Sequence, residues 1–256
     1  MNYKNIIAYL ILITTFIQVI YAQPINPSNE WPYFRGSYDG AGFSLSKAPS
    51  TFVKPRFIAL GNEFILHDDP PIVYNKKVYV VTTNGSLICI DYVNGKILWK
   101  KDGDYGVPTV VGNRLYVIDH ATLKCLDSNT GKEIWSKEGA SRKFEVIVVE
   151  GKVIYAGRVS LNCSDAKTGK LLWSNMIVNI CEPSYYKGKI YASGLGGLKC
   201  FNIDNGDIIW KRKDIGSWNT LALSDDKLII TFDKYVEKDT YIGSVIALNA
   251  NTGKTL

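Results

Sequence analysis

The sequence predicts an all-β protein, a β-propeller made of four-stranded antiparallel blades, and three observations lead to this prediction. First, an eleven-residue motif that begins with Cys and ends with Trp recurs four times, from Cys89, Cys125, Cys163 and Cys200. Second, its tryptophans are 36, 38 and 37 residues apart, which is a spacing typical of repeat architectures. Third, short β-branched and aromatic runs bounded by Gly, Asn and Asp fill each repeat and leave no room for helices. A radial stack of such sheets is a β-propeller.

Residues 1–22 precede these repeats and predict a signal peptide. Lys4 provides a short positive segment, residues 6–20 form an apolar run, and Ala22 offers a small residue for cleavage. A membrane anchor is the alternative, but about 20 apolar residues are needed to span a bilayer. We therefore expect an extracytoplasmic protein, periplasmic or secreted, with no stable membrane span after cleavage. No cysteine lies near the cleavage site, which argues against attachment of a lipid.

The composition is that of a globular protein with a mild positive charge. Hydrophobic residues make up 46% of the chain and charged residues 21%, so a sizeable core is expected and disorder is not. The net charge is +6, and the basic residues are spread along the predicted turns without a continuous run. A nucleic-acid partner is therefore not expected.

The order of strands is clearest in the second complete repeat. Strands are expected at 108–111, 114–118, 123–126 and 132–135, separated by Gly, Asn and Asp. The second strand has counterparts at 78–81, 152–155 and 189–192. Residues 56–256 are accordingly assigned to the propeller repeats, and residues 23–55 to an N-terminal leader segment.

Each motif contains a predicted tight turn. Asp91, Asp127 and Asp165 can accept hydrogen bonds from backbone N–H groups two or three residues further on. A glycine four residues after this position supplies the positive φ that a turn with a bulge requires; these glycines are Gly95, Gly131, Gly169, Gly206 and Gly253. A calcium loop is the disfavoured alternative, because Asn202 and Asn249 replace the aspartate and no glutamate completes a ligand set.

The repeated cysteines are expected to be buried thiols. The fifth repeat has Ala247 in the same position, which indicates a small buried site. Equivalent positions of neighbouring packed sheets lie about 10 Å apart, whereas a disulfide needs Cα atoms within about 7 Å. The same geometry argues against a metal site. Cys181 falls outside the pattern, and both a disulfide and a free thiol remain open for it.

The repeated tryptophans are predicted to pack against small residues of the adjacent blade. Burying about 150–250 Å² of each indole at about 25 cal/mol/Å² gives an upper estimate of about 4–6 kcal/mol per blade contact. A structural role is therefore favoured over ligand stacking.

These motifs resemble the tryptophan-docking motif of the quinoprotein (pyrroloquinoline quinone, PQQ) propeller superfamily, Ala-x-Asp-x-x-Thr-Gly-Lys-x-x-Trp. The resemblance covers residues from about 70 to 256, and Cys takes the Ala position in the four complete copies. The segment 31–36, Trp-Pro-Tyr-Phe-Arg-Gly, resembles the Trp-Pro-x-Phe-Arg-Gly leader of exported PQQ-like repeat proteins. The superfamily usually has eight blades, so we expect about five of a probable eight. The motif after Gly253 stops one residue before its tryptophan, which predicts a C-terminally truncated fragment.

The resemblance implies three candidate functions. The favoured one is an exported, non-catalytic propeller that serves as a binding or scaffold module for a protein or cell-envelope partner, similar to BamB-type outer-membrane assembly proteins. The absent lipoprotein cysteine departs from that type. A propeller joined to a further catalytic or sensory domain is another candidate.

The remaining candidate is part of a PQQ-dependent alcohol or sugar dehydrogenase. Members of that group hold the quinone between a tryptophan and a disulfide of adjacent cysteines, with calcium nearby, and no Cys-Cys pair occurs here. Trp218 with Asn219 could form a stacking floor, although a core aromatic is favoured. No catalytic, cofactor-binding or metal-binding residue is therefore assigned, and PQQ and calcium are expected only under this alternative.

Two further segments are singled out. One is a small polar cluster, predicted to be a solvated loop beside two prolines, which consists of Glu63, His67, Asp68 and Asp69. The extra stretch 233–241 of the fifth repeat is a candidate contact loop, with an inert longer hairpin as the alternative.

Overall fold

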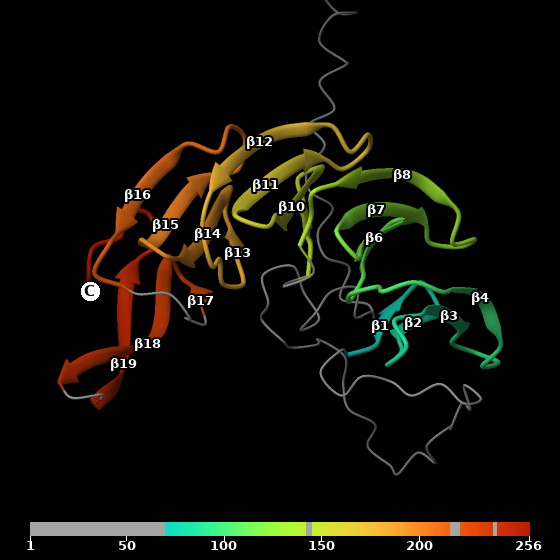
Figure 1. The fold of residues 1–256 in the computed structure, drawn as a ribbon, viewed down its shortest axis with the longest axis horizontal. Coiled ribbons are helices and arrows are strands. Elements are labelled where there is room, and N and C mark those ends of the chain that lie inside the picture. Colours follow the sequence, from blue (N-terminus) through green and yellow to red (C-terminus); the bar gives the residue numbers. More distant parts are fainter. Residues whose placement is uncertain (1–69, 142–144, 216–220, 238–239) are drawn as a thin grey trace, which may run out of the picture.

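The computed structural model describes residues 70–141, 145–215, 221–237 and 240–256, and for residues 232–242 it describes the backbone alone. Five antiparallel sheets follow one another in chain order along an arc (Figure 1). The predicted signal peptide, the leader, the cluster around His67 and the pair Trp218–Asn219 lie outside the described residues. In the part of the chain that is described, no helix is long and apolar enough to cross a membrane.

The strands confirm the all-β propeller prediction. Blade 1 contains β1 (Ile72–Tyr74), β2 (Lys77–Val81), β3 (Leu87–Asp91) and β4 (Ile97–Lys101). Blade 2 contains β5 (Thr109–Val111), β6 (Arg114–Asp119), β7 (Thr122–Asp127) and β8 (Glu133–Glu138). Blade 3 contains β9 (Ile147–Val149), β10 (Lys152–Ala156), β11 (Ser160–Asp165) and β12 (Leu171–Met176). Blade 4 contains β13 (Ser184–Tyr186), β14 (Lys189–Gly194), β15 (Gly197–Asn202) and β16 (Ile208–Arg212).

The fifth sheet differs from the predicted four-stranded blade. It has three strands, β17 (Leu221–Ser224), β18 (Lys227–Glu237) and β19 (Thr240–Asn249). An isolated bridge joins Leu248 to Thr255, at the position where a fourth strand begins in the other blades. The stretch 233–241 does not lie between the strands as expected: β18 and β19 continue their pairing from Lys227↔Asn249 as far as Glu237↔Thr240. The insertion is thus a long two-stranded extension.

Each blade packs face to face on the next one. Separate buried clusters lie between blades 1 and 2, 2 and 3, 3 and 4, and 4 and 5, and each contains a cysteine of the repeated motif. The short first strands lie on the inner side of the arc and contact one another, whereas the fourth strands form its outer rim (Figure 1). The core is therefore a series of interfaces between sheets, as expected for a propeller.

The antiparallel order gives the arc two different faces. Turns between first and second strands and between third and fourth strands lie at one end of the blades, which we call the turn face. Hairpins between second and third strands, together with the connectors from one blade to the next, lie at the other end, the loop face. The β18–β19 extension belongs to the loop face.

Candidate binding surface

The tryptophans join consecutive blades by docking into the turn of the next one. Their indole Nε1 groups donate to the carbonyl oxygens of Ser128, Ala166, Ile203 and Ala250, at 3.2, 3.2, 2.8 and 2.9 Å. Each acceptor follows directly after the Asp or Asn that begins the turn. The predicted structural role of Trp99, Trp135, Trp173 and Trp210 is confirmed.

The turn glycines are required by this docking. Gly131, Gly169, Gly206 and Gly253 have φ between +68° and +76°. A Cβ atom on Gly206 would lie 2.7 Å from Trp173, and one on Gly253 would lie 2.7 Å from Trp210. Both the backbone conformation and the close indole therefore exclude a side chain.

The aspartates build the turn as predicted. Asp127 Oδ1 accepts the backbone N–H groups of Asn129 at 3.0 Å and Thr130 at 2.8 Å. At Asp165, the hydroxyl of Thr168 donates to the carboxylate and lowers its pKa. Asn249 makes the same backbone contacts as the aspartates, to Asn251 and Thr252. These contacts confirm turn chemistry, because Oδ1 of each of these side chains accepts hydrogen bonds from its own turn.

A repeated tyrosine, which the sequence analysis overlooked, shares the same acceptors. The hydroxyls of Tyr79, Tyr116 and Tyr191 donate to Ser128, Ala166 and Ala250 at 3.1, 3.0 and 3.2 Å. Strand register places each tyrosine beside the motif cysteine, and the cysteine beside the tryptophan. The signal was available, since each tyrosine precedes its cysteine by nine or ten residues.

Blade 3 lacks the tyrosine that lies beside the motif cysteine in blades 1, 2 and 4. Ile154 takes the place of the tyrosine beside Cys163, and the hydroxyl of Tyr155 instead lies 3.3 Å from that of Ser164. The indole of Trp173 stacks on Phe201 of blade 4, with ring centroids 6.5 Å apart and an interplanar angle of 17°. The joint between blades 3 and 4 thus lacks the hydrogen bond of the repeated tyrosine and has ring stacking between the two blades instead.

The five cysteines are thiols, and all are buried. The prediction for the four repeated cysteines is confirmed, and Cys181, for which a disulfide was left open, forms none. Burial raises the pKa of Cys89, Cys163 and Cys200 to about 12, and it also raises the pKa of Cys125. The thiolate is the reactive form, so these side chains are poor nucleophiles.

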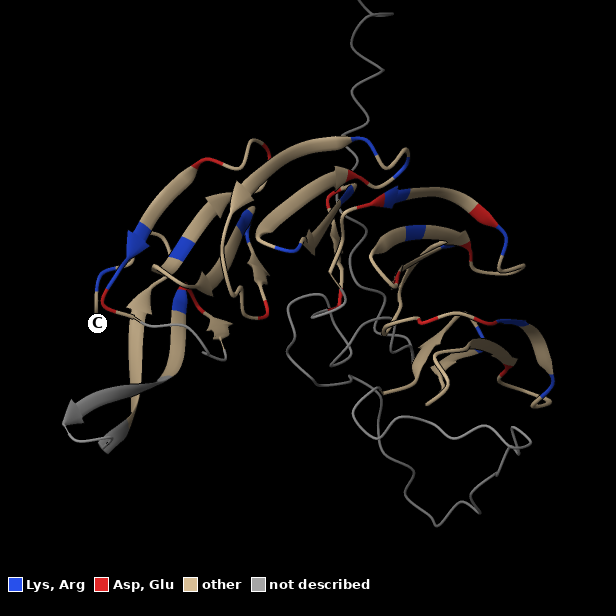
Figure 2. Ribbon diagram, in the orientation of Figure 1, with Lys and Arg blue, Asp and Glu red and all other residues tan. Residues whose placement is uncertain are grey.

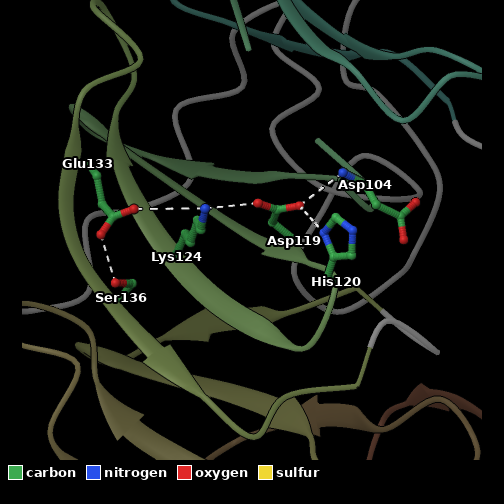
Figure 3. Close-up of polar contacts among 6 residues, drawn as sticks. All are labelled: Asp104, Asp119, His120, Lys124, Glu133 and Ser136. Atoms are coloured by element: carbon green, nitrogen blue, oxygen red, sulfur yellow. Dashed lines mark hydrogen bonds and ion pairs between the residues drawn. The ribbon is translucent and has the colours of Figure 1, made fainter. Parts of the chain in front are cut away.

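A polar network occupies the loop face where blade 1 joins blade 2 (Figure 3). Asp119 accepts hydrogen bonds from the backbone N–H of Asp104 at 2.9 Å and from Lys124 Nζ at 2.8 Å, and its carboxylate lies 2.8 Å from His120 Nδ1. Lys124 Nζ also lies 3.9 Å from Glu133. Burial opposes ionisation of Asp119, but the hydrogen bonds from Lys124 and His120 prevail and lower its pKa.

This network is a clamp between the connector and the hairpin of blade 2. The carboxylate of Asp119 is committed to three neighbours, and the hydroxyl of Ser136 donates to Glu133 at 2.7 Å (Figure 3). An isolated bridge between Tyr105 and Asp119 reinforces the contact. The clamp could not be recognised from the repeat pattern, because other repeats have Gly157 or Leu195 in the corresponding hairpin.

The corresponding joint between blades 3 and 4, also on the loop face, is apolar and exposed to solvent. Here the bridge pairs Val178 of the connector with Leu195 of the β14–β15 hairpin, and the backbone N–H of Leu195 donates to the carbonyl of Val178 at 2.7 Å. The N–H of Ile177 donates to Val159 of the β10–β11 hairpin at 3.0 Å. Met176 precedes Ile177 at the end of β12.

We call Val159, Met176, Val178 and Leu195 the loop patch. Their exposed fractions are 47%, 77%, 36% and 65%, whereas Ile177 between them is 2% exposed and packs inward. Gly194 fixes the connector, because a Cβ there would lie 2.5 Å from the side chain of Ile177 and 2.8 Å from the carbonyl of Val178. Tight packing beneath thus holds four apolar side chains at the surface.

The rim beside the loop patch is uncharged. Strand β12 contains no charged residue, whereas β4, β8 and β16 each carry Lys or Arg (Figure 2). Leu171 and Leu172 of β12 are also exposed. Strand β12 is therefore an uncharged edge of blade 3 that leads to the loop patch at the joint with blade 4.

The described residues do not fit a quinone and calcium site. In the described ranges, no three His, Cys, Asp or Glu side chains are grouped so that they could hold a metal ion. Trp99, Trp135, Trp173 and Trp210 are engaged by the turns of the next blades, and adjacent cysteines are absent from the sequence. No step of a reaction is derived from such a site.

Antiparallel blades joined by indoles that dock into Asx turns define a PQQ-like, quinoprotein-type β-propeller. A family model described as outer membrane protein assembly factor BamB matches residues 46–256. Because this match covers most of the sequence, the chain belongs to that family.

Individual relatives match the chain in part. A 53-residue segment, 20% of the chain, is 38% identical to outer membrane protein assembly factor BamB of Escherichia coli (strain K12), of which it covers 14%. The BamB crystal structure from Moraxella catarrhalis superposes with a TM-score of 0.57 and 18% identity, over 76% of this chain and 62% of that one. Quinohemoprotein alcohol dehydrogenase from Comamonas testosteroni gives a TM-score of 0.61 at 15% identity, over 89% of this chain and 48% of that one. The chain thus spans less than two thirds of these relatives, and the solved structures show the fold alone.

Proposed function

We propose that this protein is an exported, non-catalytic scaffold that binds a protein partner in cell-envelope assembly. The loop patch carries the proposal, because backbone contacts of one connector with two hairpins bring its exposed apolar side chains to the same end of the blades, and such a group is typical of a protein–protein contact. Family membership and the function for which the relatives are named, outer membrane protein assembly, support the choice of partner class.

The distribution of charge fits a protein partner better than a nucleic acid. Lys and Arg alternate with Asp and Glu along the blades (Figure 2). A polyanion requires a continuous basic surface, which this arrangement does not offer. An extracytoplasmic location follows from the predicted signal peptide and belongs to the same proposal.

Site-specific photo-cross-linking tests this function in the cells that produce the protein. A benzophenone amino acid at Leu195 should form a cross-link to a protein of outer-membrane assembly, identified by mass spectrometry. The matched control places the same group at Val93, which is an exposed apolar residue of a β3–β4 turn on the turn face.

The expected result is a defined cross-link from position 195 and none to the same protein from position 93. The double variant Val159→Asp/Leu195→Asp should remove the partner from the purified complex while the thermal unfolding of the propeller is retained. Cross-links from both positions alike, or none from position 195, would contradict the proposal.

A dehydrogenase remains the alternative function. Its discriminating measurement is titration of the protein with PQQ and Ca²⁺, followed by absorbance of the bound quinone. Stoichiometric binding that resists gel filtration would favour the enzyme, whereas the scaffold proposal expects no retained quinone.

A further inference from the structure

Met176 differs from the other described sulfur-containing residues in its exposure. All five cysteines are buried, with at most 8% of their surface exposed, whereas Met176 is 77% exposed. The sequence has one other methionine, Met1. An oxidant in solution therefore meets the thioether of Met176 before any of the thiols.

The surroundings of Met176 make its polarity important. It lies opposite Ser160 in the pairing of β11 with β12, next to the Val159 contact and directly before the inward-facing Ile177. Three of its neighbours in the loop patch are aliphatic and exposed. A polar group at this position would interrupt the apolar region of the loop face.

We propose that Met176 is an oxidation site at which hydrogen peroxide forms methionine sulfoxide, and that this modification weakens the contact of the loop patch with the protein partner of the proposed function. The sulfur lone pair attacks one peroxide oxygen, the O–O bond breaks, and an S–O bond forms. The second oxygen leaves as water after proton transfer, so the thioether loses two electrons and the peroxide gains them. The product is a polar, chiral side chain that methionine sulfoxide reductases restore.

The selectivity for this sulfur follows from burial. The thiols of the four repeated cysteines lie inside the inter-blade clusters, and burial raises the pKa of Cys89, Cys163 and Cys200 to about 12. Oxidation of a cysteine begins with the exposed thiolate. Both access and ionisation therefore protect Cys89, Cys163 and Cys200 in the folded protein, and Cys125 and Cys181 are buried as well.

The first experiment follows oxidation of the folded full chain by peptide mass spectrometry. Hydrogen peroxide should add one oxygen atom to the peptide that contains Met176, at a rate close to that of free methionine. Loss of thiols, counted after unfolding, should be at least about tenfold slower. Treatment with methionine sulfoxide reductases A and B should remove the oxygen. An unmodified Met176 peptide, or cysteines that react first, would overturn the proposal.

The second experiment measures binding of the fluorescent dye 1-anilinonaphthalene-8-sulfonate, a probe of exposed apolar surface, to the native protein. Peroxide treatment should reduce dye fluorescence of the native protein, and the polar variant Met176→Gln should show the reduced value without treatment. The matched variant Met176→Leu should bind the dye and should not respond to peroxide. Oxidation without any change in dye binding would refute the effect on the surface.

The effect on a partner rests on the proposed function, and the two can fail separately. Failure of the cross-link from position 195 rejects the scaffold function but leaves the oxidation and dye results intact. Failure of Met176 to oxidise rejects the present inference alone, because the cross-linking experiment does not depend on peroxide.

Discussion

Single residues decide whether a blade can accept the indole of its predecessor, and Gly206 is the clearest case. Gly206 and Gly112 both have positive φ, but only Gly206 is contacted by an indole, and a Cβ on Gly112 would have no atom within 4 Å. The pair therefore separates the cost of backbone conformation from the cost of a steric clash.

We expect Gly112→Ala to lower the free energy of unfolding by about 1–2 kcal/mol, which is the conformational cost alone. Gly206→Ala should cost about 1–3 kcal/mol more, because Trp173 must move. Denaturant unfolding measures both values. Equal losses of unfolding free energy in the two variants would mean that the contact of the indole with the turn adds no steric cost.

The clamp at Asp119 predicts a dependence of stability on pH. Its pKa is lowered in the folded state, so its contribution is full above the pKa of the unfolded chain, about 3.9. The contribution is lost as the pH falls through the lower, folded value. Asp119→Asn should therefore reduce the melting temperature at pH 7, and the difference from the native protein should shrink toward pH 3.

The exposed carboxylate of Asp225 provides the control for that measurement. Asp225 lies in the turn between β17 and β18, away from the clamp. Asp225→Asn should change the melting temperature little at either pH. A melting-temperature difference between Asp119→Asn and the native protein that stays constant from pH 7 to pH 3 would instead mean that the substitution acts through lost packing.

At the level of the elements, the joint between blades 3 and 4 depends on one tryptophan. Trp173 donates to Ile203 at 2.8 Å, stacks on Phe201 and is 8% exposed. Trp173→Ala should cost about 3–5 kcal/mol, whereas Leu172→Ala on the exposed side of the same strand should cost about 0.5 kcal/mol.

The distinguishing result for Trp173→Ala is loss of cooperativity. Blades 3 and 4 are then held by a weaker interface, and hydrogen exchange should report different opening free energies on the two sides of it. Uniform destabilisation of all blades would show that the joints act as one unit and would contradict this expectation.

At the level of the whole molecule, repetition explains what the sequence could predict. The turn, the docking tryptophan and the small site of Cys89, Cys125, Cys163 and Cys200 recur, so each copy supports the others. The tyrosine row also recurs and could have been recognised from its distance to the cysteine.

Features that do not recur could not be predicted in this way. The Asp119 clamp and the loop patch depend on which connector meets which hairpin, and in the described part of the chain each lies at a single joint. Likewise, the sequence showed an insertion at 233–241 but not that it continues the pairing of β18 and β19. A role of this extension in contacts stays a prediction.

The docking of the four repeated tryptophans into the following blades also gives the chain a direction. A blade presents its indole before the turn that receives it has been synthesised or exported, because the acceptor lies 29 to 40 residues further on. Each repeat is therefore completed only when its successor emerges. In a protein that crosses a membrane from its N-terminus, assembly would advance one repeat behind translocation, and every newly closed joint would oppose backward movement of the chain.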